Sequence, residues 1–198
     1  MVEFPRDPKK ISATIKRYER LLRKEQKETG TISDGYGKRY LLGILYLLLG
    51  DTTGAMNAFE WFERTFDDEG SEPFHSLTWA LTLYRSGRIE EASKKLRHTM
   101  LLNLYLIPHL LGIRQEKLDI WHASNWCERS YVSDEPAEVF ELWDGQALDW
   151  MRREYDSEEF RATRGRYIDI YRELKSEPVG RKRSQLVDEA CLLLRGGN

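Results

Sequence analysis

Residue types that carry catalysis are few in this chain of 198 residues. Its histidines and cysteines are His75, His98, His109, His122, Cys127 and Cys191. The closest His/Cys pair, His122 and Cys127, is five positions apart, which puts the two side chains on different faces of a helix. No second pair completes a zinc site, since such a site takes four ligands. We therefore expect no metal, and no other cofactor is indicated.

Motifs for nucleotide binding and for metal-dependent hydrolysis are absent as well. The chain has no Walker or His-Glu-x-x-His motif, and Gly35-Tyr36-Gly37 lacks the third glycine of a dinucleotide-binding loop. The adjacent carboxylates Glu90-Glu91 and Glu158-Glu159 point apart on a helix and suit the positive end of a helix dipole. These patterns predict that the protein is not an enzyme.

Two alternatives are kept open. One is nucleic-acid binding through the C-terminal region, where basic residues could contact phosphates. These residues are Arg161, Arg164, Arg166, Arg172, Arg181, Lys182 and Arg183. Since the net charge is −2 and no helix-turn-helix spacing occurs, we do not expect nucleic acid to be the partner. The other alternative is an enzyme on a helical scaffold, with polar residues gathered around His109, His122 and Glu128.

The composition is that of a folded and highly charged protein. Charged residues make up 32% and apolar residues 40%, with 6 Trp, 10 Tyr and 7 Phe, and disordered chains lack such burial power. This length suits one domain over residues 1–198. Two distant cysteines indicate a reducing compartment, and the N-terminus shows no apolar signal core. The longest apolar run, Tyr40 to Leu49, is ten residues, whereas a membrane span needs roughly 20. We expect a cytoplasmic protein without membrane contact.

The charge is distributed unevenly along the chain. Residues 1–40 carry a net charge of +5, residues 41–160 carry −11, and residues 161–198 carry +4. Either the basic terminal helices pack on the acidic body, or the acidic surface attracts a basic partner. The first interpretation needs no further molecule, and we favour it.

The elements that would position a site are all helical. Asp7-Pro8 is a cap followed by a first-turn proline, and the apolar stripe that follows runs at helical spacing to Gly30. The segment 36–49 is apolar on every face, which indicates a buried helix. Further helices are expected after Gly50-Asp51, Ser71 and Gly87.

The second half of the chain repeats these helix signals. We expect helices after Asp119, Ser133–Pro136 and Ser157, a break at Asp144-Gly145, and a turn at 177–180 before the last helix. No strand pattern occurs. Nine or ten helices joined by short turns therefore account for the sequence.

Two segments of this helical pattern repeat at a spacing of 37 residues. Gly50-Asp51-Thr52-Thr53-Gly54-Ala55 aligns with Gly87-Arg88-Ile89-Glu90-Glu91-Ala92. The aligned positions are Gly43, Tyr46, Gly50, Ala55 and Phe59 in the first copy and Ala80, Leu83, Gly87, Ala92 and Leu96 in the second. This pattern resembles the tetratricopeptide repeat, in which a turn glycine joins two helices and a small alanine sits where they cross. The family period is about 34, and the three extra residues fit in the turn at 67–73.

The resemblance implies an all-α fold of antiparallel helical hairpins, an α-α superhelix closed by the N- and C-terminal helices. The repeat-like core would span 34–102, and a C-terminal helical subdomain would span 119–198. Parts of residues 103–150 are similar to the helical tail of uncharacterised bacterial repeat proteins, a tail that implies no activity. Such repeats usually hold a protein or peptide, so we expect a non-catalytic protein-binding scaffold, with self-association as an open alternative.

Family members place their ligand groove on the first helix of each pair. The corresponding positions in this chain are Tyr40, Ile44, Leu47, Phe74, Leu77, Leu81 and Tyr84. An open groove this apolar would be an exposed patch of several hundred Å². We therefore expect the protein's own helices, at 8–29 or after 119, to fill it.

Overall fold

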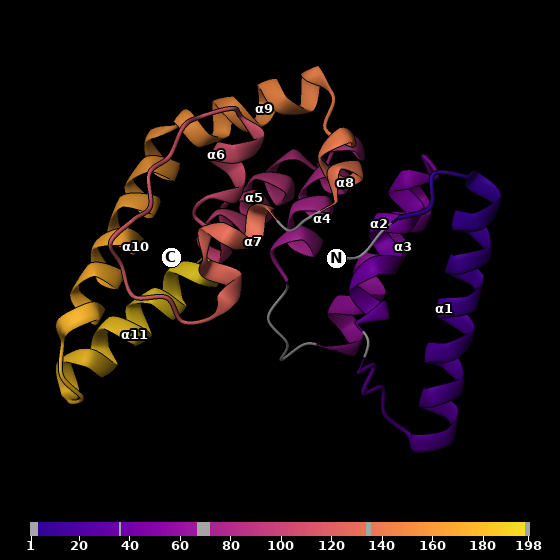
Figure 1. The fold of residues 1–198 in the computed structure, drawn as a ribbon, viewed down its shortest axis with the longest axis horizontal. Helices are drawn as coiled ribbons and strands as arrows, with labels where there is room; N and C mark the ends of the chain where they lie inside the picture. The colour runs from indigo at the N-terminus through magenta and orange to yellow at the C-terminus, as the bar shows by residue number, and fades with distance from the viewer. Residues whose placement is uncertain (1–3, 36, 67–71, 134–135, 197–198) are drawn as a thin grey trace. The chain divides into compact units, whose positions relative to one another are not determined.

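A computed structural model describes residues 4–35, 37–66, 72–133 and 136–196. Over these ranges it holds eleven α-helices, one 3₁₀ turn and no strand (Figure 1). The all-α prediction is confirmed. The chain divides into two compact units: unit 1 is Met1–Ala92 with Pro136–Trp143, and unit 2 is Ser93–Glu135 with Asp144–Asn198.

Unit 1 is built on one central helix. Its helices are α1 (Pro8–Thr29), α2 (Lys38–Leu48), α3 (Thr52–Thr65), α4 (Pro73–Arg85), the first turn of α5 (Ile89–Leu102) and α8 (Ala137–Glu141). Helices α1, α3 and α4 all pack against α2, and α3 also packs against α4 (Figure 1). Because α2 is apolar all round, it needs neighbours on several sides, as its sequence predicted.

Helix α1 begins and ends as its sequence predicts. The Asp7 carboxylate accepts a hydrogen bond of 2.8 Å from the Lys9 N–H, and Gly30 ends the helix with φ of +76°, a conformation that glycine adopts without strain. The buried residues on its inner face are Ile11, Ile15 and Leu22. Helix α1 is therefore amphipathic, with its apolar face on the rest of unit 1.

The turn between α2 and α3 closes by two backbone hydrogen bonds. The Gly50 N–H donates to the Leu47 carbonyl at 2.8 Å and the Asp51 N–H donates to the Tyr46 carbonyl at 2.9 Å. Gly50 lies at φ +75°, which makes this a Schellman motif. The Asp51 side chain then caps α3 by accepting from the Gly54 N–H at 2.8 Å.

The turn after α4 repeats this geometry 37 positions later. The Gly87 N–H donates to the Tyr84 carbonyl and the Arg88 N–H donates to the Leu83 carbonyl, both at 3.0 Å. Gly87 has the same φ of +75° as Gly50. The two aligned turns therefore have the same structure. They differ at one capping position, because Asp51, which caps α3, aligns with Arg88.

Helices α2 and α3 form the first predicted hairpin, and they touch through small residues. Ala55 and Phe59 have no exposed surface. A Cβ added to Gly43 would lie 2.7 Å from Cε2 of Phe59, and closer still to two further ring atoms. Only glycine lets the Phe59 ring approach the α2 backbone this closely.

The start of α4 corrects one expectation from the sequence. The cap is Glu72, whose carboxylate accepts a hydrogen bond of 2.8 Å from the His75 N–H, and Ser71 lies outside the described residues. Burial raises the pKa of Glu72 to about 7, although that hydrogen bond acts in the opposite direction. The sequence favoured serine because it is the more frequent cap.

Unit 2 holds the rest of α5 and the C-terminal helices. They are α6 (Leu106–Leu110), the 3₁₀ turn η1 (Asn125–Cys127), α7 (Arg129–Ser133), α9 (Gly145–Asp156), α10 (Glu158–Ser176) and α11 (Arg181–Leu194). Helix α10 packs on α9 and doubles back into α11, while α6 packs on α7 and α9 (Figure 1). Asp144 and Ser157 cap α9 and α10 with their side chains. The helix start at Ser157 was predicted, and the predicted break at Asp144-Gly145 is the start of α9.

The segment predicted to form a helix from Asp119 contains no α-helix before Arg129. Residues 112–124 lie outside the helices, and α7 begins only at Arg129. The Asp119 carboxylate pairs with Lys175 of α10 and so caps nothing. The Trp121 N–H donates to the Tyr171 carbonyl at 3.0 Å. This segment is thus held by contacts with α10, and not by helical hydrogen bonds of its own.

No helix in the described part of the chain combines the length and the apolar character needed to cross a bilayer.

Candidate functional site

The residues predicted to line a tetratricopeptide groove form part of the core of unit 1. Of these, Ile44, Leu47, Phe74, Leu77 and Leu81 are at most 3% exposed, while Tyr40 and Tyr84 are half-buried. In this state these five side chains are not accessible to a partner.

The protein's own helices contribute to this burial. Phe140 of α8 packs edge-on against Phe74, with the ring centroids 5.5 Å apart. Tyr40 packs on Phe62 of α3, with the ring centroids 5.2 Å apart. Helix α8 is held by Arg85, which donates to the Leu142 carbonyl at 2.6 Å. The return of residues 136–143 therefore closes one side of unit 1.

A different groove is open in unit 1, with walls from α1, α3 and the loop before α2 and with α2 contributing to its floor. It has a volume of about 300 Å³. Its apolar lining is Leu22, Ile32, Leu42, Ala58 and Trp61. Its polar lining is Glu19, Arg23, Gln26, Tyr46 and Asn57, with Gly54 completing the wall. An apolar floor with a charged rim is the usual form of a site that accepts an apolar side chain.

A short hydrogen-bond chain fixes one edge of this groove. The Tyr46 hydroxyl donates to one Glu19 carboxylate oxygen at 2.7 Å, and Arg23 donates to the other at 2.7 Å. Burial, together with the Glu19 carboxylate, raises the pKa of Tyr46 to about 12. The phenol therefore stays protonated as a donor, and Glu19 is held between two partners.

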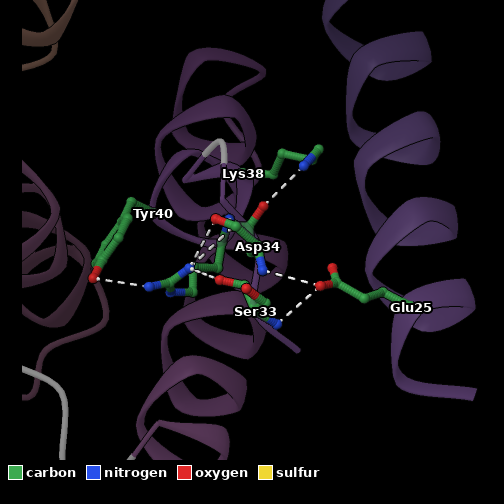
Figure 2. Close-up of polar contacts among 6 residues, drawn as sticks. Glu25, Ser33, Asp34, Lys38 and Tyr40 are labelled. Carbon is green, nitrogen blue, oxygen red and sulfur yellow. Dashed lines mark hydrogen bonds and ion pairs between the residues drawn. The ribbon is translucent and has the colours of Figure 1, made fainter. Parts of the chain in front are cut away.

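The loop that carries Ile32 into the groove is fastened by a polar cluster (Figure 2). Glu25 of α1 accepts the Ser33 N–H at 2.9 Å and the Asp34 N–H at 3.2 Å. Asp34 is buried, with a side chain that is 0% exposed. Two successive backbone N–H groups bound to one carboxylate fix the path of the loop against α1.

The Asp34 carboxylate also organises the start of α2. It accepts hydrogen bonds from the Lys38 ammonium at 2.9 Å and from the Arg39 N–H at 2.7 Å (Figure 2). The Arg39 guanidinium donates back to the Ser33 and Asp34 carbonyls at 3.3 and 3.1 Å. Asp34 lies at φ +38°, in a region that aspartate visits more readily than most residues. It acts as a helix cap from outside the helix.

A second cavity lies in unit 2, and it is polar. It has a volume of about 400 Å³ and is lined by Lys117, His122, Glu128, Arg129, Ser130 and Ser133. His122 and Glu128, two residues of the enzyme alternative, thus line the same cavity, whereas His109 does not. The contact between the Ser130 hydroxyl and Glu128 is long, at 3.4 Å. Among the described residues that line the cavity, no other hydrogen bond joins two side chains.

Buried polar groups hold the two sides of this cavity. The Asn103 amide donates to the carbonyls of Trp126 at 2.6 Å and Glu128 at 3.1 Å. Its oxygen accepts the Tyr105 N–H at 2.9 Å, and the Tyr105 hydroxyl accepts the Leu118 N–H at 3.0 Å. Asn103 is 1% exposed. The backbone of Leu118 and of Glu128, which are next to Lys117 and Arg129 in the chain, is therefore held by the hydrogen bonds of Tyr105 and Asn103.

Several basic C-terminal residues pair within the C-terminal helices, whereas Arg164 donates to Gln115. Arg166 forms a two-pronged pair with Glu189, at 2.5 and 2.6 Å, which lowers the pKa of that carboxyl. Lys182 contacts Glu177 at 2.7 Å, and Arg183 donates to the Leu174 and Glu177 carbonyls at 2.7 and 2.8 Å. The acidic partners of Arg166 and Lys182 lie beyond residue 160. Other basic residues of the two ends pair with the acidic middle, as the sequence suggested: Arg6 with Glu138 and Glu141, and Lys175 with Asp119.

In the part of the chain that the structure describes, no group of three or more His, Cys, Asp or Glu side chains could hold a metal ion. No known family model matches the chain, and no significant match is found among curated proteins or solved structures. The resemblance to tetratricopeptide repeats therefore rests on the repeated turn and on the packing of α2 and α3.

The sequence analysis named His122 and Glu128, which line the unit 2 cavity, but it predicted neither this cavity nor the groove of unit 1. From α2, the groove of unit 1 is lined by Leu42 and Tyr46, and not by Tyr40, Ile44 and Leu47, where the resemblance placed a ligand groove. The unit 2 cavity is shaped in part by Asn103, which donates to the carbonyls of Trp126 and Glu128. No sequence motif marks this asparagine. In the groove of unit 1, the sequence analysis had singled out Tyr46, as an aligned position of the repeat.

Proposed function

We propose that the protein is a non-catalytic interaction module of tetratricopeptide type, which binds a segment of another protein in the groove between α1 and α3. The observation that carries this proposal is the apolar floor of Leu22, Leu42 and Trp61 inside a polar rim. A partner side chain buried there would gain hydrophobic free energy, and the rim would orient its backbone.

The groove is also pre-formed, which favours binding because little ordering remains to be done. The Tyr46–Glu19 hydrogen bond fixes one edge, and the Asp34 cluster fixes the loop with Ile32. The contacts in both are between 2.7 and 3.3 Å.

The test is selection of displayed peptides on the wild-type protein, followed by binding to two variants. Asn57→Trp fills the mouth of the groove from an exposed position on α3. Ala13→Trp adds the same bulk on the exposed face of α1, away from the groove. We expect Asn57→Trp to weaken selected peptides at least tenfold and Ala13→Trp to leave them unchanged, since one blocked anchor is worth about 1–3 kcal/mol or more. No enrichment of peptides, or equal binding to both variants, would contradict the proposal.

A further inference from the structure

We infer that the unit 2 cavity is a binding site for a small phosphate monoester that carries hydroxyl groups. Its lining brings Lys117, Arg129 and His122 together with the hydroxyls of Ser130 and Ser133. This inference does not depend on the groove of unit 1, because the two sites share no residue.

The charges in the cavity favour an anion. Among the described residues, neither Lys117 nor Arg129 forms an ion pair, and both side chains are exposed, so both cations can approach a dianion. A guanidinium offers two parallel N–H donors that match two phosphate oxygens, and an ammonium adds a compact charge. The serine hydroxyls and the histidine ring supply further donors.

Glu128 decides what else the ligand must contain. A carboxylate beside a phosphate site repels a bare phosphate, but it accepts hydrogen bonds from hydroxyl groups. The cavity of about 400 Å³ falls within the range of about 300–1,000 Å³ usual for small-molecule sites. A sugar phosphate has both a phosphate group and hydroxyl groups. Its phosphate would bind Lys117 and Arg129, and its hydroxyls would donate to Glu128.

The backbone around the site is anchored in a way that suits a ligand. The Asn103 amide holds the carbonyls of Trp126 and Glu128 at 2.6 and 3.1 Å, and the Tyr105 hydroxyl holds the Leu118 N–H at 3.0 Å. Because Asn103 and Tyr105 are 1% and 3% exposed, these anchors are shielded from water. They fix the backbone next to Lys117 and Arg129.

The experiment is titration of the full chain with inorganic phosphate, ribose 5-phosphate and ribose, followed by amide NMR. We expect ribose 5-phosphate to bind most tightly, phosphate more weakly and ribose not at all, with shifts confined to residues 117–133. Lys117→Ala and Arg129→Ala should each weaken ribose 5-phosphate by roughly tenfold. Arg114→Ala, which removes an exposed charge outside the cavity, is the matched control and should have no effect.

The variant Glu128→Gln distinguishes the contribution of the sugar hydroxyls to binding from that of the phosphate group. It should strengthen binding of inorganic phosphate, because a negative charge is lost, and reduce the preference for ribose 5-phosphate over phosphate. The inference is overturned if neither phosphate compound shifts residues 117–133, or if Arg114→Ala weakens binding as much as Arg129→Ala does. It is also overturned if a phosphoserine peptide binds more tightly than ribose 5-phosphate, since the site would then serve a protein. Folding of each variant is checked by circular dichroism, and Arg129→Lys replaces any variant that fails to fold.

Discussion

The backbone of Gly43 lies against the ring of Phe59, so closely that a Cβ at position 43 would stand 2.7 Å or less from three ring atoms. Phe59 has no exposed surface, so its ring has nowhere to move. This contact fixes how near α2 and α3 approach.

Gly43→Ala should therefore destabilise the protein. Overpacking of a core contact costs about 1–3 kcal/mol, and the better helix propensity of alanine returns up to about 1 kcal/mol. Gly165→Ala in α10 is the control, because nothing lies within 4 Å of an added Cβ there, and it should stabilise by about 0.5–1 kcal/mol. Urea denaturation measures both. A Gly43→Ala protein as stable as the wild type would show that the Phe59 ring can move away from position 43.

Ala55→Leu and Ala92→Leu test the repeat itself. Both alanines have no exposed surface, so the larger side chain should destabilise each variant by about 1–3 kcal/mol. Ala13→Leu, on the exposed face of α1, should change the melting temperature little. If neither buried substitution lowers that temperature, the alignment of the two segments is wrong.

Glu72 makes the stability depend on pH. Burial raises its pKa from an ordinary value near 4.5 to about 7, so the folded state holds a proton that the unfolded state has lost. The free energy of unfolding should thus fall as pH rises from 4.5 to 7, by up to about 3 kcal/mol for this group.

Glu72→Gln removes this dependence, because the amide stays neutral. The difference in stability between this variant and the wild type should grow from pH 4.5 to pH 8 in favour of the variant. Glu90→Gln, which removes an exposed acid from the first turn of α5, should show no such trend. A constant difference for Glu72→Gln across this range would contradict the raised pKa.

Removal of α1 should expose the apolar surface that it covers. We expect deletion of residues 1–30 to cause aggregation, measured by light scattering and by binding of an apolar dye. The matched substitutions are Ile11, Ile15 and Leu22 to Ser on the buried face, against Lys16, Arg20 and Lys24 to Ser on the exposed face. A truncated protein that is monomeric and equally stable would show that α1 is dispensable.

Local signals in the sequence predicted much of this fold. The caps at Asp7, Asp51 and Ser157 and the turn glycines Gly50 and Gly87 depend on residues within a few positions, so the sequence pattern contains them. The all-α class follows from the same patterns, because helical periodicity recurs along the chain.

Contacts between distant residues could not be predicted in this way. Asn103 bonds to carbonyls 23 and 25 residues away, and Asp119 pairs with Lys175, 56 residues away. Such contacts replaced the expected helix after Asp119 and built the unit 2 cavity. The groove of unit 1 was missed for a related reason, since its shape depends on where α1 lies on α2.

The placement of residues 136–143 in unit 1, between two stretches of unit 2, has a consequence for biosynthesis. Neither unit is encoded by a continuous stretch of the gene, so no single cut in the chain releases an intact half. Phe74 can contact Phe140 only after residue 140 has been synthesised. Unit 1 therefore cannot finish folding when residue 92 leaves the ribosome, although domains generally fold as units during synthesis, because residues 136–143 are still missing.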